Sequence, residues 1–225
     1  TAPPKALLTC LAAVGGIEFS VVVPNLWFYI KELHGNVQDQ LHASLYFTIT
    51  MTFAKLAAGT LSDHIGFRKL YLWSTILGAA GGLTYATARI AGGIPSLLLG
   101  RLLGGAAAMT ATLANAYTVR AIPATERAET LANIAASNLV GNMVGPAVTP
   151  LWAHVRFQLG GLLVDANNLP GLLVALAFAL FGSLLLMRLR EPPPPPKLHD
   201  DTTTVTSIAH HAFCHNKQLN GSSWF

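Results

Sequence analysis

Long apolar stretches alternate with short polar segments along most of the chain. Six of these stretches hold about 20 residues or more, which is the length that a membrane-spanning helix needs. An α-helix rises about 1.5 Å per residue, so each stretch can cross the roughly 30 Å hydrocarbon layer of a bilayer. We therefore predict six membrane-spanning helices, at residues 6–30, 41–61, 70–90, 96–119, 130–152 and 169–187.

The composition agrees with an integral membrane protein. Hydrophobic residues make up 52% of the chain and charged residues only 11%, whereas soluble domains average about 25% charged residues. Strands of a membrane β-barrel would alternate apolar and polar positions over about ten residues, and the six stretches lack that alternation. The predicted fold class is therefore all-α and integral to the membrane, with the lipid bilayer as the first partner.

The basic residues indicate how the helices are oriented. A net charge of +4 could suggest nucleic acid in a soluble protein, but here the bases cluster at the ends of the predicted helices, so we expect no nucleic-acid partner. With the N-terminus in the cytoplasm, nine bases fall on the inner side and three on the outer, which predicts that both termini are cytoplasmic. The inner set is Lys5, Arg68, Lys69, Arg120, Arg127, Arg188, Arg190, Lys197 and Lys217, and the outer set is Lys31, Arg89 and Arg156.

The chain changes character after Met187. A run of prolines at 192–196 predicts a stiff, extended spacer, and the polar residues that follow show no sustained periodicity. We therefore predict two parts, a six-helix transmembrane domain at residues 1–190 and a Pro-rich, disordered cytoplasmic tail at 191–225.

The segment at residues 59–69, GTLSDHIGFRK, connects the second and third stretches and carries the most specific motif. Gly66 permits a tight turn, and Asp63 is expected to stabilise the start of the third helix through the helix dipole. The segment resembles the loop between helices 2 and 3 of the major facilitator superfamily, except that Phe67 and His64 stand where that family usually has bases. The resemblance implies a gating loop whose residues are Gly59, Asp63, Gly66, Arg68 and Lys69.

Three further segments carry the same resemblance. Residues 99–107, LGRLLGGAA, are similar to the family's helix 4 signature, and residues 120–127 are similar to its helix 4–5 loop. Residues 141–146, GNMVGP, resemble its GxxxGP element in helix 5. Small residues four positions apart let helix backbones approach closely. We therefore predict helix-packing roles for Gly100, Gly104, Gly141, Gly145 and Pro146.

The resemblance implies a fold and an activity. Members of the superfamily have twelve helices in two halves, each half is a pair of inverted three-helix repeats, and substrate binds between the halves near the middle of the membrane. This chain would be the N-terminal half alone, completed by a missing C-terminal half or by a second copy. Residues 18–27 and 126–127 resemble the lysosomal or vacuolar branch, which includes the ceroid-lipofuscinosis-type transporter and plant vacuolar phosphate carriers. A lysosomal or vacuolar membrane is therefore the expected location.

Ionisable residues within the predicted spans are functional candidates, because a charge in the bilayer costs at least a few kcal/mol. Glu18 lies about 12 residues, or about 18 Å, from either end of the first span, where desolvation favours a neutral acid that could bind a coupling proton. The alternative is a hydrogen-bonded structural acid.

Two basic residues also fall within the spans. Arg101 lies about 8 Å inside the outer end of the fourth span, and the resemblance implies that its helix and that of Glu18 both line the central cavity. A direct pair would require Arg101 to reach inward over about 10 Å or through a water, and the alternative is that it extends outward to the headgroups. Lys55, near the cytoplasmic end of the second span, is expected to extend to the headgroups.

Other chemistry is not indicated. No nucleophile–base–orienter set and no phosphate-binding Gly loop is present, so we predict no catalytic residues and no enzyme activity. No cofactor is expected either. The polar tail holds metal-ligand types without a second cluster, so we predict no metal site. These tail residues are His210, His211, Cys214 and His215, and the candidate polar contacts left unranked within the spans are Asn115, Asn133, Asn138 and Asn142.

These observations predict secondary active transport of a small molecule or ion by alternating access, with Glu18 and Arg101 as the candidate coupling residues. The alternative is a non-transporting interaction protein, in which an isolated transporter half regulates a full-length carrier. A third interpretation is an incomplete gene model, favoured by the Thr1 start and the patternless end, whose molecular function would remain that of the family.

Overall fold

The computed structural model describes residues 5–152, 154–159, 161–189 and 191–192, and its described part is mainly helical. The predicted tail lies almost entirely outside the described residues. In chain order the elements are α1 (Lys5–Glu32), α2 (Val37–Ile65), α3 (Phe67–Ala86), α4 (Ala88–Ala91), α5 (Ile94–Ala107), α6 (Thr110–Ala121), α7 (Ala124–Val148), η1 (Thr149–Trp152), β1 (Phe157–Leu159), β2 (Leu162–Val164) and α8 (Leu169–Arg188).

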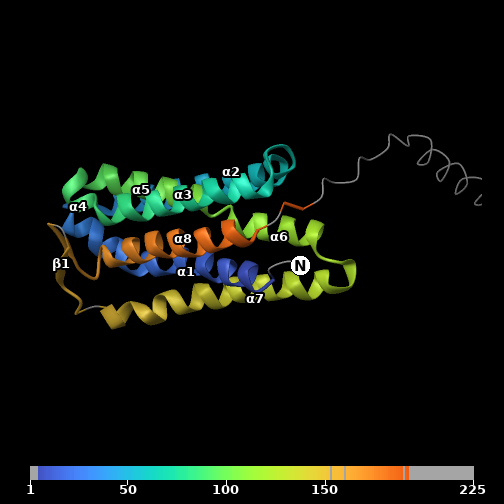
Figure 1. Ribbon diagram of the computed structural model, residues 1–225. Helices are drawn as coiled ribbons and strands as arrows, with labels where there is room; N and C mark the ends of the chain where they lie inside the picture. Colours follow the sequence, from blue (N-terminus) through green and yellow to red (C-terminus); the bar gives the residue numbers. More distant parts are fainter. Residues whose placement is uncertain (1–4, 153, 160, 190, 193–225) are drawn as a thin grey trace, which may run out of the picture. The chain divides into compact units, whose positions relative to one another are not determined.

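The long helices run alongside one another, and the chain reverses at the two ends of the bundle (Figure 1). α1 packs on α7, α3 packs on both α5 and α8, and α2 packs on α5. One end, called the hairpin end, holds the antiparallel pair β1–β2. The other, called the basic end, holds the start of α1, the α2–α3 and α6–α7 connections and the end of α8, which carry Lys5, Arg68, Lys69, Arg120, Arg127 and Arg188.

The second helix begins earlier than the span predicted at 41–61. The side chain of Asn36 accepts hydrogen bonds from the backbone N–H groups of Gln38 and Asp39, and the Asp39 carboxylate accepts one from the backbone of Asn36 at 2.8 Å. This capping box satisfies backbone donors that have no partner within the helix, so α2 begins at Val37.

The connection predicted at residues 59–69 is helical almost throughout. α2 continues to Ile65 and α3 begins at Phe67, so Gly66 alone joins the two helices. Gly66 has a φ of 92°, a conformation that L side chains rarely adopt. The sharp turn therefore depends on this glycine, whereas Gly59 is an exposed helical position with open space around it.

The span predicted at 96–119 is interrupted between α5 and α6. The carbonyl of Ala107 accepts hydrogen bonds from the hydroxyls of Ser74 at 2.9 Å and Thr110 at 2.6 Å. These hydroxyls stabilise a backbone carbonyl at the break, where the regular helical bonding is interrupted. The span predicted at 70–90 is likewise divided, because α3 ends at Ala86 and α4 is a separate turn.

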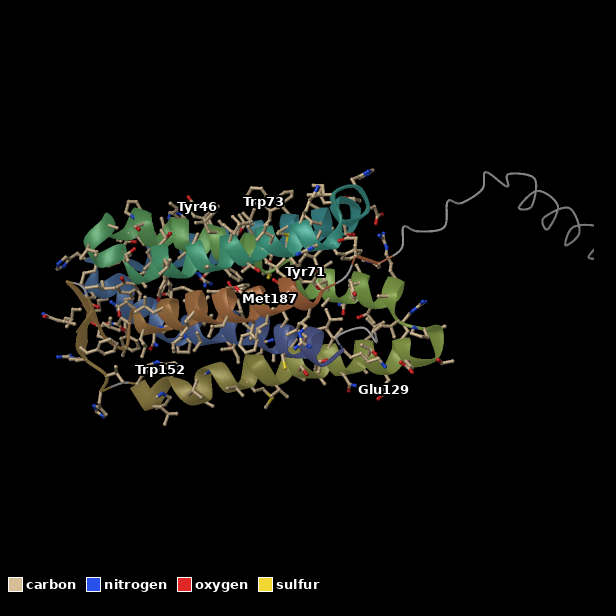
Figure 2. All side chains as sticks on the ribbon, viewed as in Figure 1. Tyr46, Tyr71, Trp73, Glu129, Trp152 and Met187 are labelled. Carbon is tan, nitrogen blue, oxygen red and sulfur yellow. The ribbon has the colours of Figure 1, made fainter. Side chains whose placement is uncertain are left out.

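The exterior of the bundle is apolar. Tyr46, Trp73 and Met187 lie on its outside, whereas Tyr71 is buried (Figure 2). An apolar exterior of this kind is typical of contact with lipid. Among the described residues, three helical runs are long and apolar enough to cross a membrane by length and composition, namely Lys5–Glu32, Ile94–Ala121 and Leu169–Arg188.

Glycines bring neighbouring helices to backbone contact. A Cβ atom on Gly100 would lie 2.7 Å from the backbone nitrogen of Tyr85, so α5 approaches α3 more closely than any side chain would allow. A Cβ atom on Gly141 would lie 3.1 Å from the nitrogen of Ile17, and Gly145 meets the same helix, α1, one turn further along. Packing without intervening side chains gives these helix pairs a close, fixed register.

Candidate transport site

Glu18 and Arg101 are both buried inside the bundle, each with 5% of its surface exposed. Glu18 is in α1 and Arg101 is in α5. Gly104 is one turn from Arg101 on the same helix, and a Cβ atom at Gly104 would lie 3.2 Å from a carboxylate oxygen of Glu18. The missing side chain at Gly104 therefore leaves room for the carboxyl group of Glu18 against α5.

The two side chains line one cavity of about 20 Å³. α3 and α8 complete its walls, largely with glycines. A single water molecule needs about 10–15 Å³, so the cavity has room for about one. The ion pairs among the described residues do not include Glu18 with Arg101, and neither Arg101 Nε nor the Tyr85 hydroxyl has a hydrogen-bond partner there. The geometry thus combines an acid, a base and a phenol around a water-sized space.

Phe47 of α2 holds the guanidinium group of Arg101 in the interior. The central carbon of that group lies 4.2 Å from the centroid of the Phe47 ring, which is cation–π geometry. The centroid of the Phe19 ring, in α1, lies 5.4 Å from the centroid of the Phe47 ring. Arg101 therefore does not extend outward to the headgroups, and sequence reasoning missed Phe47 because an aromatic residue in an apolar stretch carries no local signal.

At the basic end, Asp63 forms an ion pair with Arg120, the last basic residue of α6. The Arg120 guanidinium also lies 5.2 Å from the ring centroid of Phe67. This pairing differs from the expectation that Asp63 stabilises the start of the third helix, since the carboxylate is engaged by a base on another helix. Arg68 and Lys69, in the first turn of α3, are exposed.

The start of α3 is instead capped by Glu191, which follows the last helix. Its carboxylate accepts hydrogen bonds from the backbone N–H groups of Phe67 at 2.6 Å and Arg68 at 3.1 Å. A Cβ atom on Gly66 would lie 2.7 Å from an oxygen of the same carboxylate, so the flexible Glu191 side chain would have to shift and loosen this cap. An anion at a helix N-terminus is favourable because of the unpaired N–H groups and the helix dipole.

A second cavity, of about 240 Å³, lies between α1, α2, α7 and the α5–α6 junction. Lys55 of α2 lines it, half-buried, together with the aromatic rings of Phe19 and Phe47. The structure thus places Lys55 at the wall of a cavity, which its position in the sequence did not indicate. The four-residue spacing from Met51 to Lys55 places both side chains on the face of α2 that lines the cavity.

Two asparagines of α7 form the polar wall of this second cavity. Asn138 donates a hydrogen bond of 3.0 Å from Nδ2 to the carbonyl of Ala12 in α1. Asn142 donates one of 3.3 Å from Nδ2 to Oδ1 of Asn138. The structure thus separates the four asparagines that sequence reasoning left unranked, because Asn115 and Asn133 are exposed and do not line this cavity.

At the hairpin end, Arg89 of α4 cross-links three segments. Its guanidinium forms ion pairs with Glu32 and, at 2.6 Å, with Asp165, and donates a hydrogen bond of 3.2 Å to the carbonyl of Leu163. Asn167 donates a further bond of 2.8 Å to Glu32. Sequence reasoning used Arg89 only to orient the chain, because its partners lie 57 and 76 residues away.

Comparison with known proteins gives a consistent family. The sequence profile described as Major Facilitator Superfamily matches residues 8–224. Similar curated proteins are an SPX domain-containing membrane protein from Oryza sativa subsp. japonica and another from Arabidopsis thaliana. Each is 28% identical over 144 residues, which cover 64% of this chain and 20% of the relative. The chain thus matches about a fifth of the length of these relatives.

Two solved structures share the fold. A D-xylose-proton symporter superposes with a TM-score of 0.64 at 17% identity, over 92% of this chain and 53% of the symporter. The inward-open xylose transporter XylE from E. coli gives a TM-score of 0.66 at 16% identity, over 98% of this chain and 57% of that protein. The chain therefore has the architecture of about half of such a transporter.

Proposed function

The chain belongs to the Major Facilitator Superfamily, and from this premise we propose that it forms the N-terminal six-helix half of a proton-coupled secondary transporter. The whole moves a small solute by alternating access, in which the central site opens to each side of the membrane in turn. The observation that carries the proton-coupling proposal is the buried cavity shared by Glu18 and Arg101. An ionisable pair inside a membrane bundle is expensive and by default has a function.

Glu18 is the group that binds the coupling proton. Its carboxyl group is enclosed by helices, so a carboxylate there depends on Arg101 for compensation, whereas the neutral acid does not. Arg101 has two competing partners, the carboxylate and the ring of Phe47. Loss of the proton draws the guanidinium towards Glu18 and away from Phe47, and proton binding releases it again. A proton at Glu18 thereby changes the packing of α2 on α5.

The basic end serves as the cytoplasmic gate. Asp63 and Arg120 join α2 to α6, and Glu191 joins the chain after α8 to α3. A partly exposed ion pair such as Asp63–Arg120 contributes little to stability, so it can break and reform as helix ends move. Both termini face the cytoplasm, and the membrane is lysosomal or vacuolar.

Completion of the transport path requires a second six-helix unit. The solved structures that resemble this chain are about twice as long, and the chain covers 53% and 57% of them. A C-terminal half or a second copy supplies the remainder.

The test uses proteoliposomes that contain the chain joined to a second six-helix half, loaded with a pH-sensitive dye and challenged with a panel of sugars, carboxylates and inorganic phosphate. Glu18→Gln is expected to abolish solute uptake driven by a pH gradient and to retain solute exchange at equal pH. Glu129→Gln, which removes an exposed carboxyl group from α7, is the matched control and should behave as the parent (Figure 2). Gradient-driven uptake at the parent rate in Glu18→Gln would show that Glu18 is a structural acid.

A further inference from the structure

The second cavity described above, around Lys55, carries an inference that deepens the proposed function and rests on it. Its wall comes from Gly15 and Phe19 of α1, Met51 and Lys55 of α2, the α5–α6 junction and α7. Met51 is midway along α2, and Phe19 is midway along α1. The cavity is therefore at mid-depth in the bundle, where a carried solute must pass.

Lys55 supplies an uncompensated positive charge. Among the described residues, no carboxylate lies within ion-pair distance of its amino group, and no hydrogen bond of that group is found. Glu18 is adjacent to Phe19 in sequence but lines the other cavity, with Arg101. A half-buried ammonium group at this depth is costly when it stands alone, and an anionic ligand would compensate it.

The asparagine pair supplies an oriented acceptor. Asn138 is anchored to α1 through the carbonyl of Ala12, and its own oxygen accepts from Asn142, so both amides have a defined orientation. This leaves Oδ1 of Asn142 without a donor among the described residues. A ligand that satisfies both groups presents an anionic group to Lys55 and a hydrogen-bond donor, such as a hydroxyl, to Asn142.

The size and the walls of the cavity select an organic ligand. Its volume is about 240 Å³, far larger than the cavity of Glu18 and Arg101 and a little below the roughly 300–1,000 Å³ of typical ligand pockets, so there is room for a small organic solute. Phe19, Phe47 and Met51 form an apolar side that suits a carbon skeleton. We propose that this cavity binds a small hydroxycarboxylate anion of the size of glycerate, with its carboxylate on Lys55 and a hydroxyl on Asn142.

Phe47 gives the proposed site a physical connection to the proton site. The Phe47 ring lines the cavity proposed for the anion, and the guanidinium of Arg101 packs over the same ring. Phe47 and Glu18 compete for the guanidinium of Arg101. A bound anion that packs against Phe47 therefore affects this competition. Occupancy of one cavity is transmitted to the other through a single aromatic side chain.

The experiment measures binding of radiolabelled D-glycerate to the 225-residue chain in lipid nanodiscs by equilibrium dialysis at neutral pH. Saturable binding is expected. Lys55→Met should weaken it by about tenfold or more, because a charge-assisted hydrogen bond is lost, while Lys55→Arg should retain most of it. Lys31→Met removes an exposed lysine in the last turn of α1, away from the cavity, and should leave binding unchanged.

Competition between unlabelled compounds and labelled glycerate identifies the ligand class. It is measured on the parent chain, so it does not depend on whether Lys55→Met folds. Unlabelled glycerate should displace the label, whereas acetate, which lacks a hydroxyl, and neutral D-xylose should compete only weakly. Equal displacement by D-xylose would overturn the anion site, and stronger displacement by inorganic phosphate would overturn the organic assignment. A lack of saturable glycerate binding would also overturn the proposal, and so would an equal loss of binding in Lys31→Met and Lys55→Met. Binding needs no pH gradient, so it can persist when proton-coupled uptake fails, and the two proposals are thereby separated.

Discussion

The carboxylate of Glu191 accepts a hydrogen bond of 2.6 Å from the backbone N–H of Phe67, a residue 124 positions earlier in the chain. A second bond, from the N–H of Arg68, makes the contact bidentate. The segment that follows the last helix thus caps the helix that follows the Gly66 turn. Two parts of the basic end are joined by one side chain.

Removal of the cap should loosen the start of α3. Glu191→Ala leaves two backbone donors without their acceptor, which costs about 1 kcal/mol by analogy with other N-caps. Hydrogen exchange measured by mass spectrometry should become faster in the first turn of α3 and stay unchanged in α5. Glu129→Ala, an exposed carboxyl group on α7, is the control. Unchanged exchange at residues 67–70 in Glu191→Ala would refute the role of the cap.

Separation of Asp63 from Arg120 should affect transport more than stability. The Asp63 side chain is 45% exposed, so Asp63→Asn is expected to change the free energy of unfolding by less than about 1 kcal/mol. Uptake by a complete transporter should nevertheless fall severalfold, because the pair joins α2 to α6 at the proposed cytoplasmic gate, while membrane insertion stays intact. The double variant Asp63→Arg with Arg120→Asp restores opposite charges and should recover part of the activity. Parent uptake kinetics in Asp63→Asn would remove the gating role.

A methyl group on Gly100 should destabilise the bundle. Gly100→Ala places a Cβ atom 2.7 Å from a backbone nitrogen of α3, so the two helices must move apart, at a cost of about 1–3 kcal/mol. Gly59→Ala is the matched control, since nothing lies within 4 Å of its new Cβ atom and alanine favours a helix. Thermal unfolding in detergent should show a lower midpoint for Gly100→Ala alone. Equal midpoints for the two variants would show that α3 and α5 adjust freely.

The basic end should face the cytoplasm. Most bases of the described residues gather there, and positive charge is retained on the cytoplasmic side during insertion. A pH-sensitive fluorescent reporter fused after residue 197 should report cytoplasmic pH, and a reporter inserted at the hairpin end should report the opposite compartment. The reverse pattern would reject this topology and the assignment of the gate to the cytoplasmic side.

Features that depend on near neighbours in the chain could be predicted from the sequence. The turn at Gly66 was readable because the polar motif falls between two apolar stretches. The contacts at Gly100 and Gly141 followed from small residues four positions apart. The capping box of Asn36 and Asp39 was equally local and could have been found, since its partners are three residues apart.

Features that depend on partners far away in the chain could not be predicted from the sequence. The partner of Asp63 is on α6, and Arg89 is held by acids from two other segments. Lys55 had a reasonable local interpretation, extension to the headgroups, and nothing in its neighbourhood in sequence indicated a cavity shared with Asn142. Side chains that meet across a bundle are chosen by helix rotation and register, which single helices do not encode.

The sequence by itself determined that this is a helical membrane protein of the Major Facilitator Superfamily with a buried acid at mid-span. Hydrophobic length and short motifs suffice for this, because each helix satisfies its own backbone in the bilayer. Only the tertiary structure decided that Glu18 and Arg101 share one cavity, that Phe47 lies between that cavity and the one of Lys55, and that Glu191 caps α3. The physical reason is that these relationships depend on how helices pack, and close packing at glycines sets which side chains face one another.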